Sequence, residues 1–324
     1  MYIDDSLMSY EESLVFSLRA LYQGQGYKRY KMSKFEPYDL YATNKEFLIS
    51  DNVISFTDTN GKLMALKPDV TLSLVRNCRF DPSELARICY DENVYRVSQS
   101  TGAFKELMQA GVECLGAVDR QCVIDVLLLA TQSLASISPD NRLIVTDLDL
   151  VSSIVEGWKL SSPDQQSVYD FISRKNYHEL ERLCTSCGIP ADEVARLIEL
   201  LMYDGATVDL PAWLAERGYD AQAIETIQAI IDAFTAAGLA DVLRFDFSLM
   251  NDTSYYNGIV FQGYVLGVPS EVLSGGQYDK LMRKLGKAGN AVGFAVYVDA
   301  LGSFAKAARI SGVSQMKEAT NVNA

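Results

Sequence analysis

The sequence predicts an α+β fold with a mostly antiparallel sheet. Stretches that alternate apolar and polar residues follow one another as hairpins and meanders, at about 54–66, 85–115 and 243–265. The helical patterns gather in separate runs, the longest at about 162–239. Strands alternating with helices would instead indicate βαβ units and a parallel sheet. The 324 residues, 48% of them hydrophobic, suffice for one large domain or two small ones.

The N-terminal part is expected to contain a capped helix and a hairpin. Ser9 and Glu12 form a capping-box pattern before leucines at helical spacing, so a helix is expected to run to about residue 24. Two strands are predicted at 54–58 and 63–66, joined by a type I′ turn at Asn60-Gly61. A short helix is expected at 71–77.

The remaining strands are expected on both sides of a helical block. Strand patterns occur at 85–95, 109–115, 143–148, 243–247, 255–265 and 291–297, and helical patterns at 123–135 and 298–310. The 255–265 segment is expected to be a hairpin that turns near Asn257-Gly258, or to carry a bulge there. Helical repeats at about 162–240, broken at 188–190 and 204–205, indicate a helical insertion within one domain spanning residues 1–324.

Composition argues against several classes of function. The net charge is −13 and the pI about 4.6, which disfavours nucleic acid as a partner. A cluster of basic residues at 28–34 is expected to be a solvated loop or a partner contact. The absence of a long apolar run and of a signal-peptide pattern favours a cytoplasmic protein without a membrane span.

The cysteines and the single histidine argue against metal and nucleophilic chemistry. Cys184 and Cys187 form a C-x-x-C pair that no second pair supports, so no metal site is expected and reduced thiols are favoured. The role of the pair is left open. A catalytic triad or Cys-His pair would have to use His178, which lies on an expected surface helix.

A group of polar residues at strand ends and on one strand is a candidate ligand site. These residues are Asp69, Thr71, Gln109 and Glu113. Gln109 and Glu113 have period-two spacing along one strand and therefore share a face of the sheet. Two carboxylates suit an ammonium group, and an amide suits a polar side chain. The residues alone favour a different interpretation, a solvated sheet face or internal salt bridges with Arg76 or Arg96.

Four motifs resemble a known family. They are Leu66-Lys67-Pro68-Asp69-Val70-Thr71, the segment 109–116, Tyr255-Tyr256-Asn257-Gly258-Ile259-Val260-Phe261 and Gly275-Gly276-Gln277-Tyr278-Asp279. In this order they resemble the catalytic core of histidyl-tRNA synthetase, over most of residues 8–310. The resemblance implies a class II aminoacyl-tRNA synthetase-like core with a six- or seven-stranded, largely antiparallel sheet flanked by helices.

The resemblance also implies a histidine-binding site. Its expected residues are Asp69, Thr71, Arg96, Gln109, Glu113, Tyr255, Tyr256 and Tyr278. Asp69 and Glu113 are expected to hold the ammonium group, Thr71 and Gln109 to hydrogen-bond the ligand, and Arg96 to take its carboxylate. The two adjacent tyrosines would enclose the imidazole ring, although strand alternation suggests that one of them belongs to the core, and Tyr278 would be a pocket wall.

Several departures point away from a synthetase. Two positions where the family carries catalytic arginines hold Asn251 and Ala300, Ser98 stands at an acidic position, and Tyr297 replaces a small residue. The chain also has about twenty-four residues after Ala300, so no anticodon-binding domain is expected. Loss of one such charge stabilisation typically costs about 10²–10³ in rate.

The combination resembles the synthetase-like regulatory subunits of ATP phosphoribosyltransferase. It implies a non-catalytic dimer without a cofactor that activates the short catalytic subunit and senses L-histidine in the first step of histidine biosynthesis. Two alternatives stay open: a ligase that adenylates an amino acid, and a binding module that uses the fold without a small ligand. The stoichiometry of the complex, the interface with the catalytic subunit and histidine binding by the isolated chain cannot be inferred from the sequence.

Overall fold

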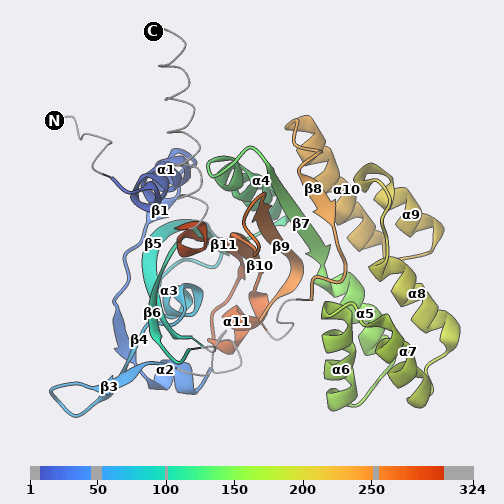
Figure 1. Cartoon of the computed structure of the whole chain (residues 1–324), viewed down its shortest axis with the longest axis horizontal. Coiled ribbons are helices and arrows are strands. Elements are labelled where there is room, and N and C mark those ends of the chain that lie inside the picture. Colours follow the sequence, from blue (N-terminus) through green and yellow to red (C-terminus); the bar gives the residue numbers. More distant parts are fainter. Residues whose placement is uncertain (1–7, 45–52, 99–100, 251–254, 303–324) are drawn as a thin grey trace, which may run out of the picture.

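A central eight-stranded sheet dominates the computed structural model, which describes residues 8–44, 53–98, 101–250 and 255–302 (Figure 1). In spatial order its strands are β1 (Lys28–Arg29), β5 (Leu85–Val97), β6 (Phe104–Gly116), β11 (Asn290–Tyr297), β10 (Leu273–Gln277), β9 (Asn257–Val265), β7 (Asn141–Asp147) and β8 (Leu243–Phe245). Only the two edge pairs, β1–β5 and β7–β8, are parallel. The predicted α+β class with a largely antiparallel sheet is confirmed.

The expected number of strands was too low. Eight strands form the sheet where six or seven were predicted, because β1 is only two residues long and lies inside the basic cluster that was taken for a loop or a partner contact. A second, three-stranded sheet contains β2 (Phe35–Pro37), β4 (Leu63–Leu66) and β3 (Ser55–Thr57). In β1, Arg29 forms an ion pair with Asp91 at 2.8 Å.

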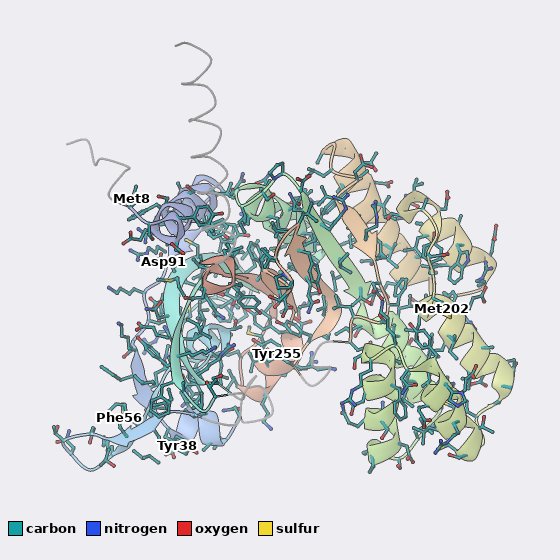
Figure 2. All side chains as sticks on the ribbon, viewed as in Figure 1. Met8, Tyr38, Phe56, Asp91, Met202 and Tyr255 are labelled. Atoms are coloured by element: carbon teal, nitrogen blue, oxygen red, sulfur yellow. The ribbon has the colours of Figure 1, made fainter. Side chains whose placement is uncertain are left out.

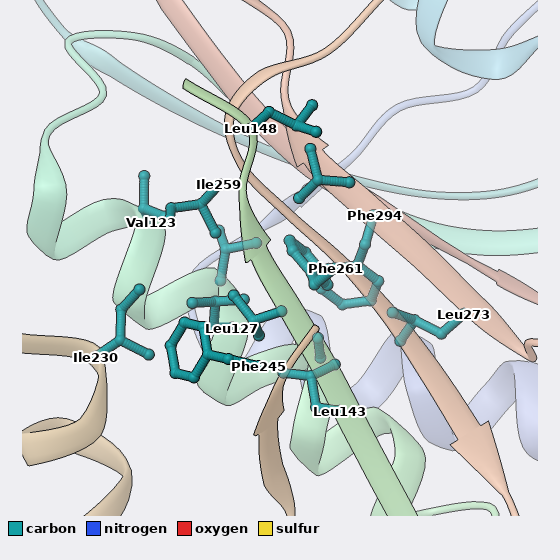
Figure 3. Packing of buried hydrophobic residues seen from close by; sticks show 14 of the residues in the cluster. Val123, Leu127, Leu143, Leu148, Ile230, Phe245, Ile259, Phe261, Leu273 and Phe294 are labelled. Carbon is teal, nitrogen blue, oxygen red and sulfur yellow. The ribbon is translucent and has the colours of Figure 1, made fainter. Parts of the chain in front are cut away.

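Helices cover both faces of the sheet. The helices outside the long helical block are α1 (Tyr10–Gly24), α2 (Asp39–Ala42), α3 (Val70–Asn77), α4 (Arg120–Ala135), α5 (Leu148–Gly157), α11 (Asp279–Lys284) and the 3₁₀ turn η4 (Val298–Leu301). Adjacent residues of β6 belong to different hydrophobic clusters: Cys114 packs with α1 and α4, and Leu115 packs with α3 and α11. Figure 3 shows the first cluster, where Val123 and Leu127 of α4 lie near Phe261 of the sheet.

Local signals in the sequence explain where several elements begin. The capping box at Ser9 is present, with the Glu12 amide donating to the Ser9 hydroxyl at 3.1 Å and the Ser9 amide donating to the Glu12 carboxylate at 2.8 Å. Asp69 caps α3 by accepting a hydrogen bond from the Leu72 amide at 2.7 Å. These three bonds satisfy amides that a helix N-terminus would otherwise leave without a partner.

The turn predicted at Asn60-Gly61 was wrong, and of the two alternatives for Asn257-Gly258 only the hairpin turn was wrong. The β3–β4 connection is a five-residue loop in which Gly61 has a positive φ of 79° and Asn60 does not, so it is not a type I′ turn. The Asp58 carboxylate instead accepts hydrogen bonds from the amides of Asn60 and Lys62. No hairpin turn occurs at Asn257-Gly258, because β9 is continuous there and the register with β10 shifts at that point, as the bulge alternative predicted.

The long helical block lies beside the β7–β8 edge of the sheet (Figure 1). Its elements are α6 (Ser162–Ser173), α7 (Tyr177–Ser186), α8 (Ala191–Leu201), η3 (Thr207–Asp209), α9 (Leu210–Glu216) and α10 (Ala221–Ala236). The chain leaves helical structure at 188–190 and 204–205, as predicted. Leu180 and Ile230 of this block share a hydrophobic cluster with the sheet. Its status as an inserted subdomain stays a prediction.

The cysteine pair and the histidine lie in this block, far along the chain from the polar motifs. Cys184 is buried, Cys187 is exposed, and His178 is exposed on α7. Across the described ranges, no cluster of three or more potential ligands could hold a metal ion. None of the helices described is both long and apolar enough to span a membrane. The predicted helix at 298–310 begins as η4, and its part beyond residue 302 lies outside the described residues.

A buried ion pair holds the first synthetase-like motif against the sheet. The Lys67 side chain is fully buried, and its ammonium lies 2.9 Å from the Glu92 carboxylate on β5. Glu92 also accepts a hydrogen bond from the Met32 amide at 3.0 Å. The pair therefore joins β5, the segment that leads into α3, and the chain before β2.

Replacing Lys67 by methionine should destabilise the fold by about 3–5 kcal/mol, because Glu92 would be left buried without its countercharge. The measurement is urea unfolding at pH 7, with Lys62→Met in the exposed β3–β4 loop as the control. The double variant Lys67→Met/Glu92→Gln should recover most of the loss, since glutamine can still accept from the Met32 amide. Equal stability of Lys67→Met and Lys62→Met would contradict the role given to the ion pair.

Candidate functional site

One cavity of about 370 Å³ opens on the face of the sheet that α3 covers, and small residues form its floor. The strand register places Gly111 of β6 opposite Ala295 of β11, and Ala295 opposite Ser274 of β10. In the next row, Gly293 lies between Glu113 and Gly276. Because the middle of the sheet carries almost no side-chain volume here, a ligand-sized space remains between the larger residues around it.

All eight predicted site residues line this one cavity. They are Asp69, Thr71, Arg96, Gln109, Glu113, Tyr255, Tyr256 and Tyr278. They come from the start of α3, from β5 and β6, from the residues just before β9 and from the residue that follows β10. Tyr255 lies in the central part of the molecule, well away from the helical block that carries Met202 (Figure 2). Their role as ligand contacts stays a prediction.

Glu113 is the buried acid at the bottom of the cavity. Only 1% of its surface is exposed, and each carboxylate oxygen accepts one hydrogen bond: 2.7 Å from the Thr71 hydroxyl and 2.6 Å from the Tyr278 hydroxyl. Burial raises the pKa of Glu113 to about 8, although these two hydrogen bonds oppose the shift. In the empty cavity at pH 7, Glu113 therefore holds a proton most of the time, and a cation beside it would drive that proton off.

Gly293 makes room for this carboxyl group. A Cβ at this position would lie 1.8 Å from the nearer Glu113 oxygen and 2.5 Å from the Val112 carbonyl oxygen. Since Gly293 and Glu113 face each other across β11 and β6, a side chain here would push the acid out of its two hydrogen bonds. Glycine is therefore required here by its close contacts with Glu113 and with the Val112 carbonyl, and not by a positive φ.

Asp69 supplies a second carboxyl group from the N-terminus of α3. One of its oxygens caps the helix, and burial raises its pKa, while the bond from the Leu72 amide and the charge of Arg96 act in the opposite direction. The charge of Asp69 in turn contributes to the raised pKa of Glu113. Two buried acids in a shared cavity, one of which raises the pKa of the other, are a favourable environment for a ligand cation.

Arg96 and Gln109 place polar groups on the wall of the cavity. The Arg96 Nε donates to the Pro68 carbonyl at 3.0 Å, and among the residues that the structure describes Arg96 forms no ion pair. The alternative of a salt bridge with Arg96 or Arg76 is not supported for that part of the chain. The Gln109 amide is buried at the cavity wall. A guanidinium that lines the cavity suits a carboxylate.

Three tyrosines form an aromatic wall. The rings of Tyr255 and Tyr256 lie 4.6 Å apart in an edge-on arrangement, and Tyr278 lies 6.0 Å from Tyr255. Both tyrosines of the adjacent pair line the cavity, and Tyr255 also belongs to the buried core cluster, as expected for one of the two. Strand alternation is not the reason, because both residues precede β9. Burial raises the pKa of Tyr255 and Tyr278 well above the usual value, so both hydroxyls stay neutral donors or acceptors.

Other lining residues were not predicted as contacts. They are Tyr90, Gln262, Glu271, Ser274, Phe294 and Tyr297, with Gly293 and Ala295 on the floor. Gln262 is oriented by Tyr264, whose hydroxyl donates to it at 2.6 Å. Only Tyr297 had been noted from the sequence, as a departure from the family. The signal that could have found the others is strand register, which a single sequence does not fix.

The positions that depart from the synthetase pattern lie in different parts of the fold. Ala300 is in η4, directly after β11, and Tyr297 is at the end of β11 on the cavity wall. Asn251 lies outside the described residues. Ser98 follows β5, two residues after Arg96.

The fold and the cavity define a class II synthetase-like domain with a pocket of amino-acid size. The sequence model described as histidyl-tRNA synthetase matches residues 4–301. The chain belongs to this family.

Relatives and solved structures give the comparison more detail. A protein of Bacillus mycoides named ATP phosphoribosyltransferase regulatory subunit is 26% identical over 295 residues, which cover 89% of this chain and 70% of the relative. A structure described as an ATP phosphoribosyltransferase regulatory subunit/histidyl-tRNA synthetase from Bacillus halodurans has a TM-score of 0.78 and 22% identity, covering 92% of this chain and 80% of that one. A chain from the ATP phosphoribosyltransferase (HisG:HisZ) complex of Thermotoga maritima has a TM-score of 0.71 and 18% identity, with 89% and 97% covered.

Gly293→Ala should destabilise the protein by about 1–3 kcal/mol, because the new methyl group would overlap the Glu113 carboxyl and the Val112 carbonyl. Thermal and urea unfolding would measure the change. Gly157→Ala is the matched control, since a Cβ there meets nothing within 4 Å and alanine favours the helix. If both variants unfolded at the same urea concentration as the parent, the close approach of Gly293 and Glu113 would be refuted.

Proposed function

We propose that this chain is the non-catalytic regulatory subunit of an ATP phosphoribosyltransferase, and that its cavity binds L-histidine as the feedback signal. The regulatory assignment is supported by the names of its relatives and by the likeness to a chain of the HisG:HisZ complex. The cavity carries the histidine proposal, because paired acids, an arginine and an aromatic wall line one space of about 370 Å³. The partner would be the short catalytic subunit, with this chain present as a dimer.

In the proposed complex each part of histidine meets a matching group. Asp69 and Glu113 accept hydrogen bonds from the ammonium group, and Thr71 and Gln109 complete that contact. Arg96 takes the carboxylate, and the tyrosine wall encloses the imidazole. Binding would exchange the proton on Glu113 for the ligand's positive charge, so the buried acid would not be left unpaired.

The same residues argue against adenylation as the activity. Transfer to the α-phosphate of ATP develops negative charge that cationic groups must stabilise. Arg96 is the one arginine that lines the cavity within the described part of the chain, and it is assigned to the ligand carboxylate. With Ala300 and Asn251 at the other two positions, we infer a synthetase site without its charge stabilisation.

The decisive experiment measures phosphoribosyl-ATP formation by the short catalytic subunit of the same organism. Adding this chain should raise the rate, and adding L-histidine should then lower it, while the catalytic subunit alone shows neither effect. Glu113→Gln should raise the histidine concentration for half-inhibition by about 10–150-fold, the equivalent of one hydrogen bond to a charged group. Glu156→Gln, an exposed carboxylate change on α5, is the control.

The result could contradict the proposal at either step. No activation would remove the regulatory assignment, and amino-acid-dependent exchange of pyrophosphate into ATP would then be the next measurement. Activation that histidine leaves unchanged would remove the histidine site and keep the regulatory assignment. If Glu113→Gln lost activation of the catalytic subunit as strongly as it lost inhibition by histidine, the role of Glu113 would be structural.

Histidine affinity should rise with pH between about 7 and 8. Burial raises the pKa of Glu113 to about 8, so below that pH the ligand ammonium must displace a proton. The histidine affinity should therefore fall by up to about tenfold for each pH unit below 8. Calorimetry at pH 7 in two buffers with different heats of ionisation should detect about one released proton per histidine. Glu113→Gln should release none. A pH-independent affinity in the parent would show that Glu113 is already ionised.

A further inference from the structure

The far end of the cavity is closed by a pair of side chains that no ligand contact above uses. The hydroxyls of Tyr297 and Ser274 lie 2.6 Å apart, joining β11 to β10. Along β11, Gly293, Ala295 and Tyr297 share the cavity face, so a large ring follows two small residues. The side-chain volume on the cavity face of β11 therefore increases sharply at Tyr297.

The strand register shows how this ring lies. Ser274 is paired with Ala295, not with Tyr297, whose own neighbour on β6 is Gln109. To reach the Ser274 hydroxyl, the Tyr297 side chain must lean diagonally from its own row over the Ala295 row. The ring thus crosses the strip of small residues and forms a wall at its end. Burial raises the pKa of Tyr297, so the hydroxyl stays protonated for this bond.

Arg96 places the carboxylate end of the proposed ligand beside this wall. Its positive charge acts on the Tyr297 hydroxyl and lowers the pKa of that group against the effect of burial. Both residues line the same cavity. A ligand whose carboxylate meets Arg96 therefore shares its cavity with the Tyr297 ring.

We propose that Tyr297, held by Ser274, is the residue that restricts the pocket to free amino acids and excludes ligands extended beyond the α-carboxylate. This rests on the proposed histidine site and adds its length limit. The chemical class that the pocket accepts is then an α-amino acid with a free carboxylate. A histidyl peptide, which carries the same ammonium and imidazole, would collide with the ring.

The test compares L-histidine with L-histidylglycine, which keeps an ammonium group, an imidazole and a terminal carboxylate but is one residue longer. Binding is measured by calorimetry on the full chain assembled with the short catalytic subunit, and the signal of the catalytic subunit alone is subtracted. In the parent the dipeptide should bind at least about tenfold more weakly, as expected when an extra group is forced into a packed site. Tyr297→Ala should reduce this ratio at least about fivefold, because it removes the wall.

Two further variants keep the result interpretable. Tyr297→Phe removes the hydroxyl and keeps the ring, so it should still discriminate against the dipeptide more than Tyr297→Ala does. Tyr297→Leu, with a smaller loss of volume, replaces the alanine variant if that one does not fold. The ratio of the two affinities is the readout, and a general loss of stability would not change it selectively.

The outcomes separate this inference from the histidine site itself. A parent that binds histidine and the dipeptide within about threefold would overturn the length limit alone. So would a folded Tyr297→Ala that binds histidine with the parental ratio. A parent that binds neither ligand would contradict the proposed histidine site, and the inference with it.

Discussion

The buried carboxyl group of Glu113 is the constraint on which the candidate site depends. Its two hydrogen bonds come from Thr71 at the start of α3 and from Tyr278 between β10 and α11, so one acid joins three parts of the chain that are far apart in sequence. It fits only because Gly293 faces it without a side chain. Burial raises the pKa of this acid to about 8 while its two donors favour the anion, so a cation that arrives beside it can displace its proton.

The shape of the rest of the cavity depends on the small residues on this face of the sheet. Gly293 and Ala295 add little side-chain volume to the centre of the floor, and larger side chains on the neighbouring strands and on α3 surround it. The other face of the same strands packs tightly against α1 and α4. One face of the sheet therefore supplies stability and the other supplies the site, and strand alternation keeps the two functions apart.

Periodicity in the sequence predicted the type of fold, and the family resemblance carried by short motifs, such as the one that contains Asp69 and Thr71, implied the eight residues that the structure brings to one cavity. It did not predict the contacts that depend on register. The approach of Gly293 to Glu113, and of Ser274 to Tyr297, joins strands whose pairing has no local signal. The turn at Asn60-Gly61 failed for a related reason, since the Asp58 side chain organises that loop in a way that the dipeptide does not reveal.

In the proposed regulation, a histidine signal would reach the catalytic partner through elements that respond to the ligand, and the site suggests which ones. Binding would change the charge of Glu113, and with it the hydrogen bonds that fix α3 and the start of α11. A coupling of about 1–3 kcal/mol is typical of allosteric pairs, which is comparable to one hydrogen bond to a charged group. The change at this single acid is therefore large enough to carry the proposed regulation, without a rearrangement of the sheet.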